Sequence, residues 1–107
     1  MKITDLLTKD SISIGESLNS KNEAIDTAVD LMNNLNNIED LEEFKKQVYH
    51  REEQGSTGVG EGVAIPHGKS KAVKEPGLAA ITIPDGVEFD SLDGNPVNLL
   101  FLIAAPD

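Results

Sequence analysis

Apolar residues recur at helical spacing in two early segments of the chain. The first helix is predicted from residue 21 to about residue 35, because Ser20 and Glu23 form a capping box ahead of one apolar face. The same N-terminal pattern, starting at Asp40, predicts a second helix that ends near residue 53. The apolar positions are Ile25, Ala28, Val29, Met32 and Leu35 in the first segment and Leu41, Phe44 and Val48 in the second.

Short apolar runs separated by glycine and proline predict strands in most of the remaining chain. The last run, residues 97–105, is continuously apolar, which is typical of a strand buried on both faces. A strand buried on both faces needs helices on both sides of the sheet, and only two helices, both earlier in the chain, are predicted. We therefore expect that the chain is part of a larger domain or that a partner covers the second face of this strand. The other predicted strands are residues 11–14, 63–65 and 78–83, with a polar connection at 69–77 and turns at 84–86 and 92–96.

These elements predict one α/β domain over residues 1–107, with a mixed central β-sheet flanked by helices. Aromatic residues are 4% of the chain, so its core must be aliphatic. A net charge of −10 argues against binding to nucleic acid or anionic membranes. The chain has no cysteine, no long apolar run for membrane insertion and no signal-peptide pattern in residues 1–5, which favours a cytoplasmic protein.

The candidate chemistry centres on His67, which follows a glycine-rich loop and a short apolar run. Pro66 fixes the backbone before it, and Gly68 allows a close approach after it. A lone histidine is more often structural than catalytic, but this setting favours a directed imidazole. Near neutral pH its ring offers a nucleophilic nitrogen. With no metal-ligand set nearby, nucleophilic or acid–base chemistry is favoured over zinc binding.

Arg51 lies at the predicted end of the second helix, before the glycine-rich loop. A guanidinium near a nucleophilic histidine would bind a phosphoryl oxygen, although Arg51 could equally compensate the helix dipole. The neighbouring His50 is expected to be a solvated surface residue.

The glycine-rich loop does not fit the common nucleotide-binding patterns. The glycines at 62 and 68 are one residue too far apart for a phosphate-binding loop, and Val63 stands where a dinucleotide motif needs glycine. We therefore interpret Gly60 and Gly62 as positions where the chain or a phosphate comes close. A serine triad is not supported.

Residues 51–70 closely resemble the IIA component of the bacterial sugar phosphotransferase system, fructose/mannitol type. The matching stretch is Arg51-Glu52, Gly55-Ser56-Thr57-Gly58-Val59-Gly60-Glu61-Gly62 and Val63-Ala64-Ile65-Pro66-His67-Gly68. The resemblance implies the fold of that family and a phosphocarrier without metal or cofactor. His67 would accept a phosphoryl group from phospho-HPr and pass it to a cysteine of the IIB component. Arg51 would bind the phosphoryl oxygens, and Glu61 aligns beside the site.

The resemblance also covers the rest of the chain more weakly, most like the fructose branch. The family has a second active-site histidine beyond the stretch that matches residues 104–106, so the resemblance implies that residues 1–107 are the N-terminal two-thirds of a IIA domain. The stretch at 90–94 resembles the fructose branch of the family, which favours a role in sugar uptake over a regulatory role. The alternatives are a nitrogen-regulatory IIA that signals by protein binding, and an interaction domain in which His67 packs structurally.

Overall fold

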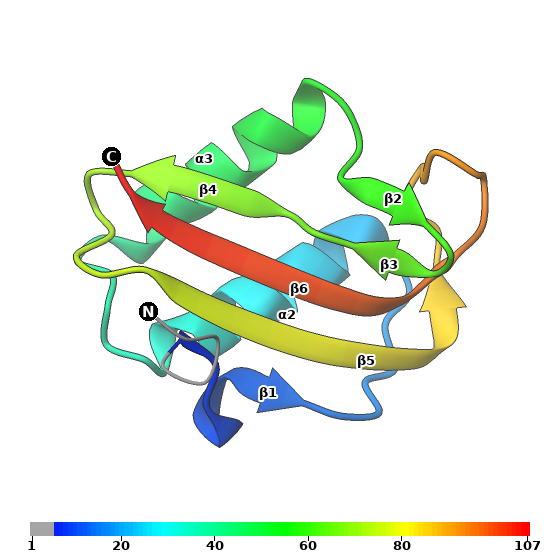
Figure 1. Cartoon of the computed structure of the whole chain (residues 1–107), viewed down its shortest axis with the longest axis horizontal. Coiled ribbons are helices and arrows are strands. Elements are labelled where there is room, and N and C mark those ends of the chain that lie inside the picture. The colour runs from blue at the N-terminus through cyan, green and yellow to red at the C-terminus, as the bar shows by residue number, and fades with distance from the viewer. Residues whose placement is uncertain (1–5) are drawn as a thin grey trace.

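The computed structural model describes residues 6–107, and within them a mixed sheet of six strands is covered on one face by two helices (Figure 1). The predicted α/β class is confirmed. Residues 1–5, part of the expectation about a signal peptide, lie outside the described residues. In chain order the elements are η1 (Lys9–Ser11), β1 (Ile12–Ser13), α2 (Lys21–Asn33), α3 (Leu41–Glu53), β2 (Gly58–Gly60), β3 (Val63–Ala64), β4 (His67–Ser70), β5 (Gly77–Val87) and β6 (Val97–Pro106).

Both helices begin where their capping residues predict. The Ser20 hydroxyl accepts a hydrogen bond from the Glu23 backbone N–H at 3.1 Å. The Asp40 carboxylate does the same for the Glu43 N–H at 3.2 Å. Each bond satisfies one of the backbone donors that a helix start leaves without a partner.

β6 is the strand around which the other elements are arranged. β5 pairs with it antiparallel on one side, while β3 and β4 pair with it parallel on the other side. Between β3 and β4 the ladder is bridged by a 3.0 Å hydrogen bond from the Ile103 N–H to the Pro66 carbonyl. This arrangement places His67 directly opposite Ile103 in the sheet.

The two faces of β6 have different surroundings. Leu100, Leu102 and Ala104 are fully buried on the face that α2 and α3 cover. Phe101 and Ile103 alternate with them and are only half-buried. The expectation that β6 is buried on both faces is therefore wrong within residues 6–107, because both helices pack on the same face of the sheet (Figure 1).

Two stretches read as irregular from the sequence belong to strands. Residues 67–70 form β4, although a polar connection was expected from residue 69, because parallel pairing with β6 supplies their backbone partners. The predicted turn at 84–86 lies inside β5. Here the register of β5 against β6 shifts between Thr82 and Val87, and Gly86 has φ +77°. The turn residues therefore produce an irregularity in the strand instead of ending it.

Gly68 is required where β4 packs on α3. A Cβ at this position would lie 2.8 Å from Val48 Cγ2 and 2.9 Å from Phe44 Cε1. We expect Gly68→Ala to lower the free energy of unfolding by about 1–3 kcal/mol, because both neighbours are buried and cannot move aside freely. Urea denaturation would measure this loss, with Lys69→Ala at the exposed neighbouring position as the control. Equal stability of the two variants would contradict the prediction.

Candidate functional site

An open pocket of about 630 Å³ surrounds His67 on the face of the sheet opposite the helices. Arg51 lines the same pocket, so the structure brings together the two residues that the sequence singled out most strongly. The rest of the lining is largely apolar, apart from Lys69 and the hydroxyl residues Ser56 and Thr57. The lining residues are Arg51, Ser56, Thr57, Val59, Ile65, His67, Gly68, Lys69, Leu92, Ile103 and Ala105.

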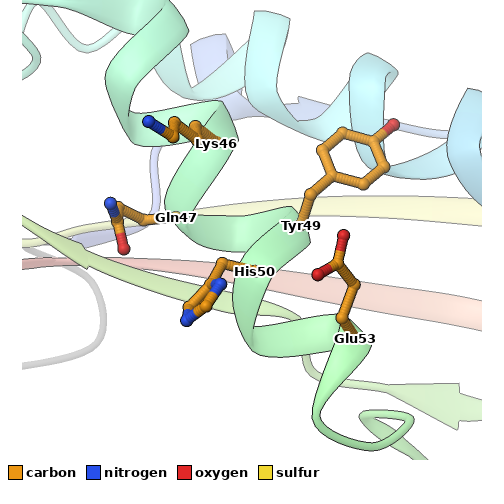
Figure 2. A pocket seen from close by; sticks show the side chains of 5 residues that line it. All are labelled: Lys46, Gln47, Tyr49, His50 and Glu53. Atoms are coloured by element: carbon orange, nitrogen blue, oxygen red, sulfur yellow. The ribbon is translucent and has the colours of Figure 1, made fainter.

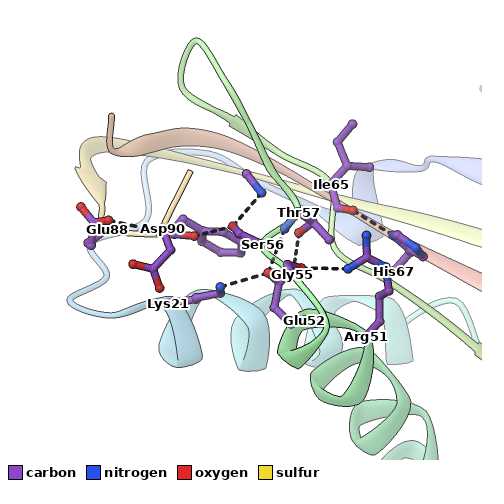
Figure 3. A network of polar contacts seen from close by, with 12 residues as sticks. Lys21, Arg51, Glu52, Gly55, Ser56, Thr57, Ile65, His67, Glu88 and Asp90 are labelled. Carbon is purple, nitrogen blue, oxygen red and sulfur yellow. Dashed lines mark hydrogen bonds and ion pairs between the residues drawn. The ribbon is translucent and has the colours of Figure 1, made fainter. Parts of the chain in front are cut away.

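His67 is the first residue of β4 and is half-buried. Its Nδ1 lies 3.1 Å from the carbonyl oxygen of Ile65 (Figure 3). A carbonyl oxygen can only accept a hydrogen bond, so this geometry assigns the ring proton to Nδ1. The neutral ring then carries its lone pair on Nε2, which is the nitrogen available for bonding to another group.

Arg51 occupies the last turn of α3. Its Nη1 donates a 2.8 Å hydrogen bond to the carbonyl oxygen of Gly55, just beyond the helix (Figure 3). A guanidinium carries five N–H donors, so this bond restricts the orientation of the side chain while engaging one donor. The arrangement suits the binding of an anion in the pocket.

Glu52 is a buried carboxylate whose structural role the sequence analysis did not recognise. It is 8% exposed, and it accepts hydrogen bonds from the Thr57 backbone N–H, at 2.9 Å, and from the Thr57 hydroxyl. Its Oε2 lies 3.0 Å from Lys21 Nζ. A signal was present in the sequence, because Glu52 continues the four-residue spacing of Phe44 and Val48 and so falls on the apolar face of its helix.

Gly60 ends β2, and Glu61 and Gly62 form the turn to β3; none of the three residues lines the His67 pocket. Gly60 and Gly62 have φ of +106° and +79°, and Glu61 also has a positive φ of +56°. A Cβ at Gly60 would approach Asp93, and one at Gly62 would approach Asn98, so the close approach expected here is made by the chain itself. The Glu61 N–H donates to the Asp93 carboxylate at 2.8 Å, which lowers the pKa of Asp93.

His50 is exposed on α3, as expected, and lines a different pocket of about 420 Å³ (Figure 2). That pocket is lined entirely from the same helix. Its other lining residues are Lys46, Gln47, Tyr49 and Glu53. His50 therefore offers a natural comparison for His67 within the same chain.

Neither a metal-ligand cluster nor a membrane-spanning helix is found within residues 6–107. No group of three or more His, Cys, Asp or Glu side chains in this range could hold a metal ion. None of the helices in this range has the length and apolar character needed to cross a membrane.

The sequence profile described as "Phosphoenolpyruvate-dependent sugar phosphotransferase system, EIIA 2" matches residues 5–107. The chain belongs to this family. Its relatives include a fructose-specific EIIABC component, of which the chain spans 17%, and mannitol-specific IIA components.

Known proteins with a IIA part resemble nearly all of this chain in sequence and in fold. The fructose-specific EIIABC component of Bacillus subtilis is 42% identical over 107 residues, which are 100% of this chain and 17% of that protein. The nitrogen regulatory protein IIA-Ntr of Neisseria meningitidis is 33% identical, with a TM-score of 0.89 over 96% of this chain and 70% of that one. Enzyme IIAMTL, solved in complex with phosphorylated enzyme IIBMTL from Escherichia coli, is 27% identical with a TM-score of 0.83, over 94% of this chain and 70% of that one.

Proposed function

We propose that His67 accepts a phosphoryl group from phospho-HPr and passes it to a cysteine of a IIB component during phosphoenolpyruvate-dependent sugar uptake. The observation that carries this proposal is the open pocket that His67 and Arg51 both line. The imidazole is reachable, its proton is held on Nδ1 by the Ile65 carbonyl, and a guanidinium lines the same space.

The transfer at His67 needs no separate base. Nε2 attacks the phosphorus as the P–N bond to the donor histidine breaks, and the electron pair of that bond returns to the donor ring. Nδ1 keeps its proton throughout, bonded to Ile65. In the second step a cysteine thiolate attacks the phosphorus, a P–S bond forms, and the electron pair of the P–N bond returns to Nε2. Such a transfer depends mainly on positioning and on charge stabilisation.

Positive charge in the pocket supports this assignment. A phosphoryl group would add about two negative charges to a chain that already carries −10. Arg51 and Lys69 both line the pocket and can offset that charge. Glu61, Gly60 and Gly62, which were expected to support the phosphoryl group, hold the neighbouring β2–β3 turn in this proposal.

The relatives support the choice of partners and of pathway. The complex of IIAMTL with phosphorylated IIBMTL supports a IIB component as the acceptor. The 42% identity to a fructose-specific component favours sugar uptake over nitrogen regulation. The domain boundaries are part of the same proposal: residues 1–107 would be the N-terminal two-thirds of a IIA domain, which agrees with the half-buried apolar residues on the outer face of β6.

Incubating the full-length protein with phosphoenolpyruvate, enzyme I and HPr tests the proposal. We expect one phosphoryl group per chain, located on the peptide that contains His67 by mass spectrometry under conditions that preserve phosphohistidine. A phosphoryl group on His50, or no phosphorylation at all, would contradict the proposal.

A further inference from the structure

We propose that Glu52, paired with Lys21, is a positioning residue that sets the orientation of both His67 and Arg51. The inference rests on the proposed function, in which these two side chains bind the phosphoryl group. It adds an ion pair outside the pocket, between buried Glu52 and partly exposed Lys21, through which the first turn of α2 supports the site.

Both carboxylate oxygens of Glu52 are used. Oε2 accepts the Thr57 backbone N–H at 2.9 Å and lies 3.0 Å from Lys21 Nζ, while Oε1 accepts the Thr57 hydroxyl (Figure 3). A buried carboxylate is costly unless it is paired and hydrogen-bonded, and here it is both. Thr57 is therefore held at two of its atoms by one rigid acceptor.

A continuous set of hydrogen bonds leads from Thr57 to His67. The carbonyl of Thr57 accepts the Ile65 N–H at 3.0 Å. The carbonyl of Ile65 in turn lies 3.1 Å from His67 Nδ1. A displacement of Thr57 would move the Ile65 peptide, and the His67 ring would lose the partner that fixes its orientation and its proton.

The same loop holds Arg51. Its guanidinium donates to the Gly55 carbonyl, two residues before Thr57. The Gly55 N–H is itself bonded to the backbone carbonyl of Glu52 at 3.2 Å. Release of Thr57 would therefore loosen the acceptor that orients Arg51 as well as the one that orients His67.

Lys21 supports this loop at a second point. Its Nζ lies 4.7 Å from the centroid of the Phe89 ring, a favourable cation–π contact. The carbonyl of Phe89 accepts a 2.6 Å hydrogen bond from the Ser56 hydroxyl, the residue before Thr57. Lys21 therefore contacts two residues, Glu52 and Phe89, that each hold the loop.

The chain contains a matched control for this ion pair. Lys45 and Asp26 form a second ion pair between α3 and α2 at 3.1 Å, and both side chains are far more exposed than Glu52. Neither of them is bonded to the loop at residues 54–57. If such ion pairs only hold the two helices together, removal of either pair should have the same effect on His67.

The test compares Lys21→Met and Glu52→Gln with the control Lys45→Met in the full-length protein. Nitrogen-15 NMR of the imidazole reports the tautomer of His67. In the wild type we expect the ring proton on Nδ1. Both test variants should shift protons to Nε2 and slow phosphoryl transfer from phospho-HPr by about 10- to 100-fold, as expected for a small misplacement of reacting groups. Lys45→Met should change neither property. Urea denaturation identifies any variant that fails to fold, and Lys21 is partly exposed, so its variant should fold.

Tautomer populations and transfer rates that match Lys45→Met in both folded test variants would overturn the inference. Absence of phosphorylation in the wild type would instead overturn the proposed function. The tautomer shift, which needs no phosphoryl donor, would then still decide whether Glu52 positions His67.

Discussion

The His67→Ala variant should not be phosphorylated by phosphoenolpyruvate, enzyme I and HPr, whereas His50→Ala should be phosphorylated like the wild type. The reason is that only His67 lines the pocket with Arg51, while His50 lies exposed in a different pocket on α3. Incorporation of labelled phosphate measures the difference. Urea denaturation should show that both variants fold, because His67 is half-buried on the open face of the sheet. Full labelling of the folded His67→Ala variant would remove this residue from the proposed role.

Arg51→Ala should lower the rate of phosphoryl transfer by about 10²- to 10³-fold, the usual cost of removing one preorganised donor from a developing charge. Arg51→Lys should recover only part of the rate, because lysine keeps the charge but not the planar set of donors that also binds Gly55. Rapid-quench measurement of transfer from phospho-HPr gives both rates.

The control for Arg51 is the stability of the same variants. Arg51 lies in the last turn of α3, where loss of a favourable charge–dipole interaction costs about 0.3–1 kcal/mol of unfolding free energy. A small change in stability together with a large change in rate would separate phosphoryl binding from helix stabilisation. A rate equal to that of the wild type would place Arg51 outside the transfer site.

Local chemistry made the helices predictable from the sequence. Ser20 and Asp40 accept the backbone N–H groups at the helix starts, and these bonds involve residues only three positions apart. The long strand at residues 97–105 was also predicted closely. The apolar run could not show that both helices pack on the same face of that strand, because their placement depends on contacts between segments that are distant in the sequence.

Strand β4 was not predicted because its residues do not resemble a strand by composition. The segment His67–Ser70 contains glycine, lysine and serine, and its extended form depends on parallel pairing with β6, more than thirty residues later. The predicted turn at 84–86 failed for a related reason. Its residues favour a turn locally, but β5 continues through them with a shifted register.

The site was partly predictable. His67 stood out because its setting between proline and glycine after a glycine-rich loop is unusual for a structural residue, whereas for Arg51 the local sequence left phosphoryl binding and helix-dipole compensation equally open; the structure places both in one pocket. Glu52 was not recognised because its importance comes from contacts with Thr57 and Lys21, and Lys21 is remote in sequence. The glycines at 60 and 62 were placed near the chemistry by proximity in the sequence, yet their turn faces Asp93.

The bond between His67 Nδ1 and the Ile65 carbonyl also limits the order of events in the proposed relay. Because Nδ1 is hydrogen-bonded to the backbone of the same chain, the phosphoryl group can be gained and lost only at Nε2. The phosphoryl donor and the phosphoryl acceptor must therefore approach His67 from the same side, and they cannot both contact its ring at the same time. The chain would bind the donor and the acceptor in turn, as two separate binary complexes. An excess of either partner in its unphosphorylated form would slow phosphoryl transfer by occupying the shared binding surface.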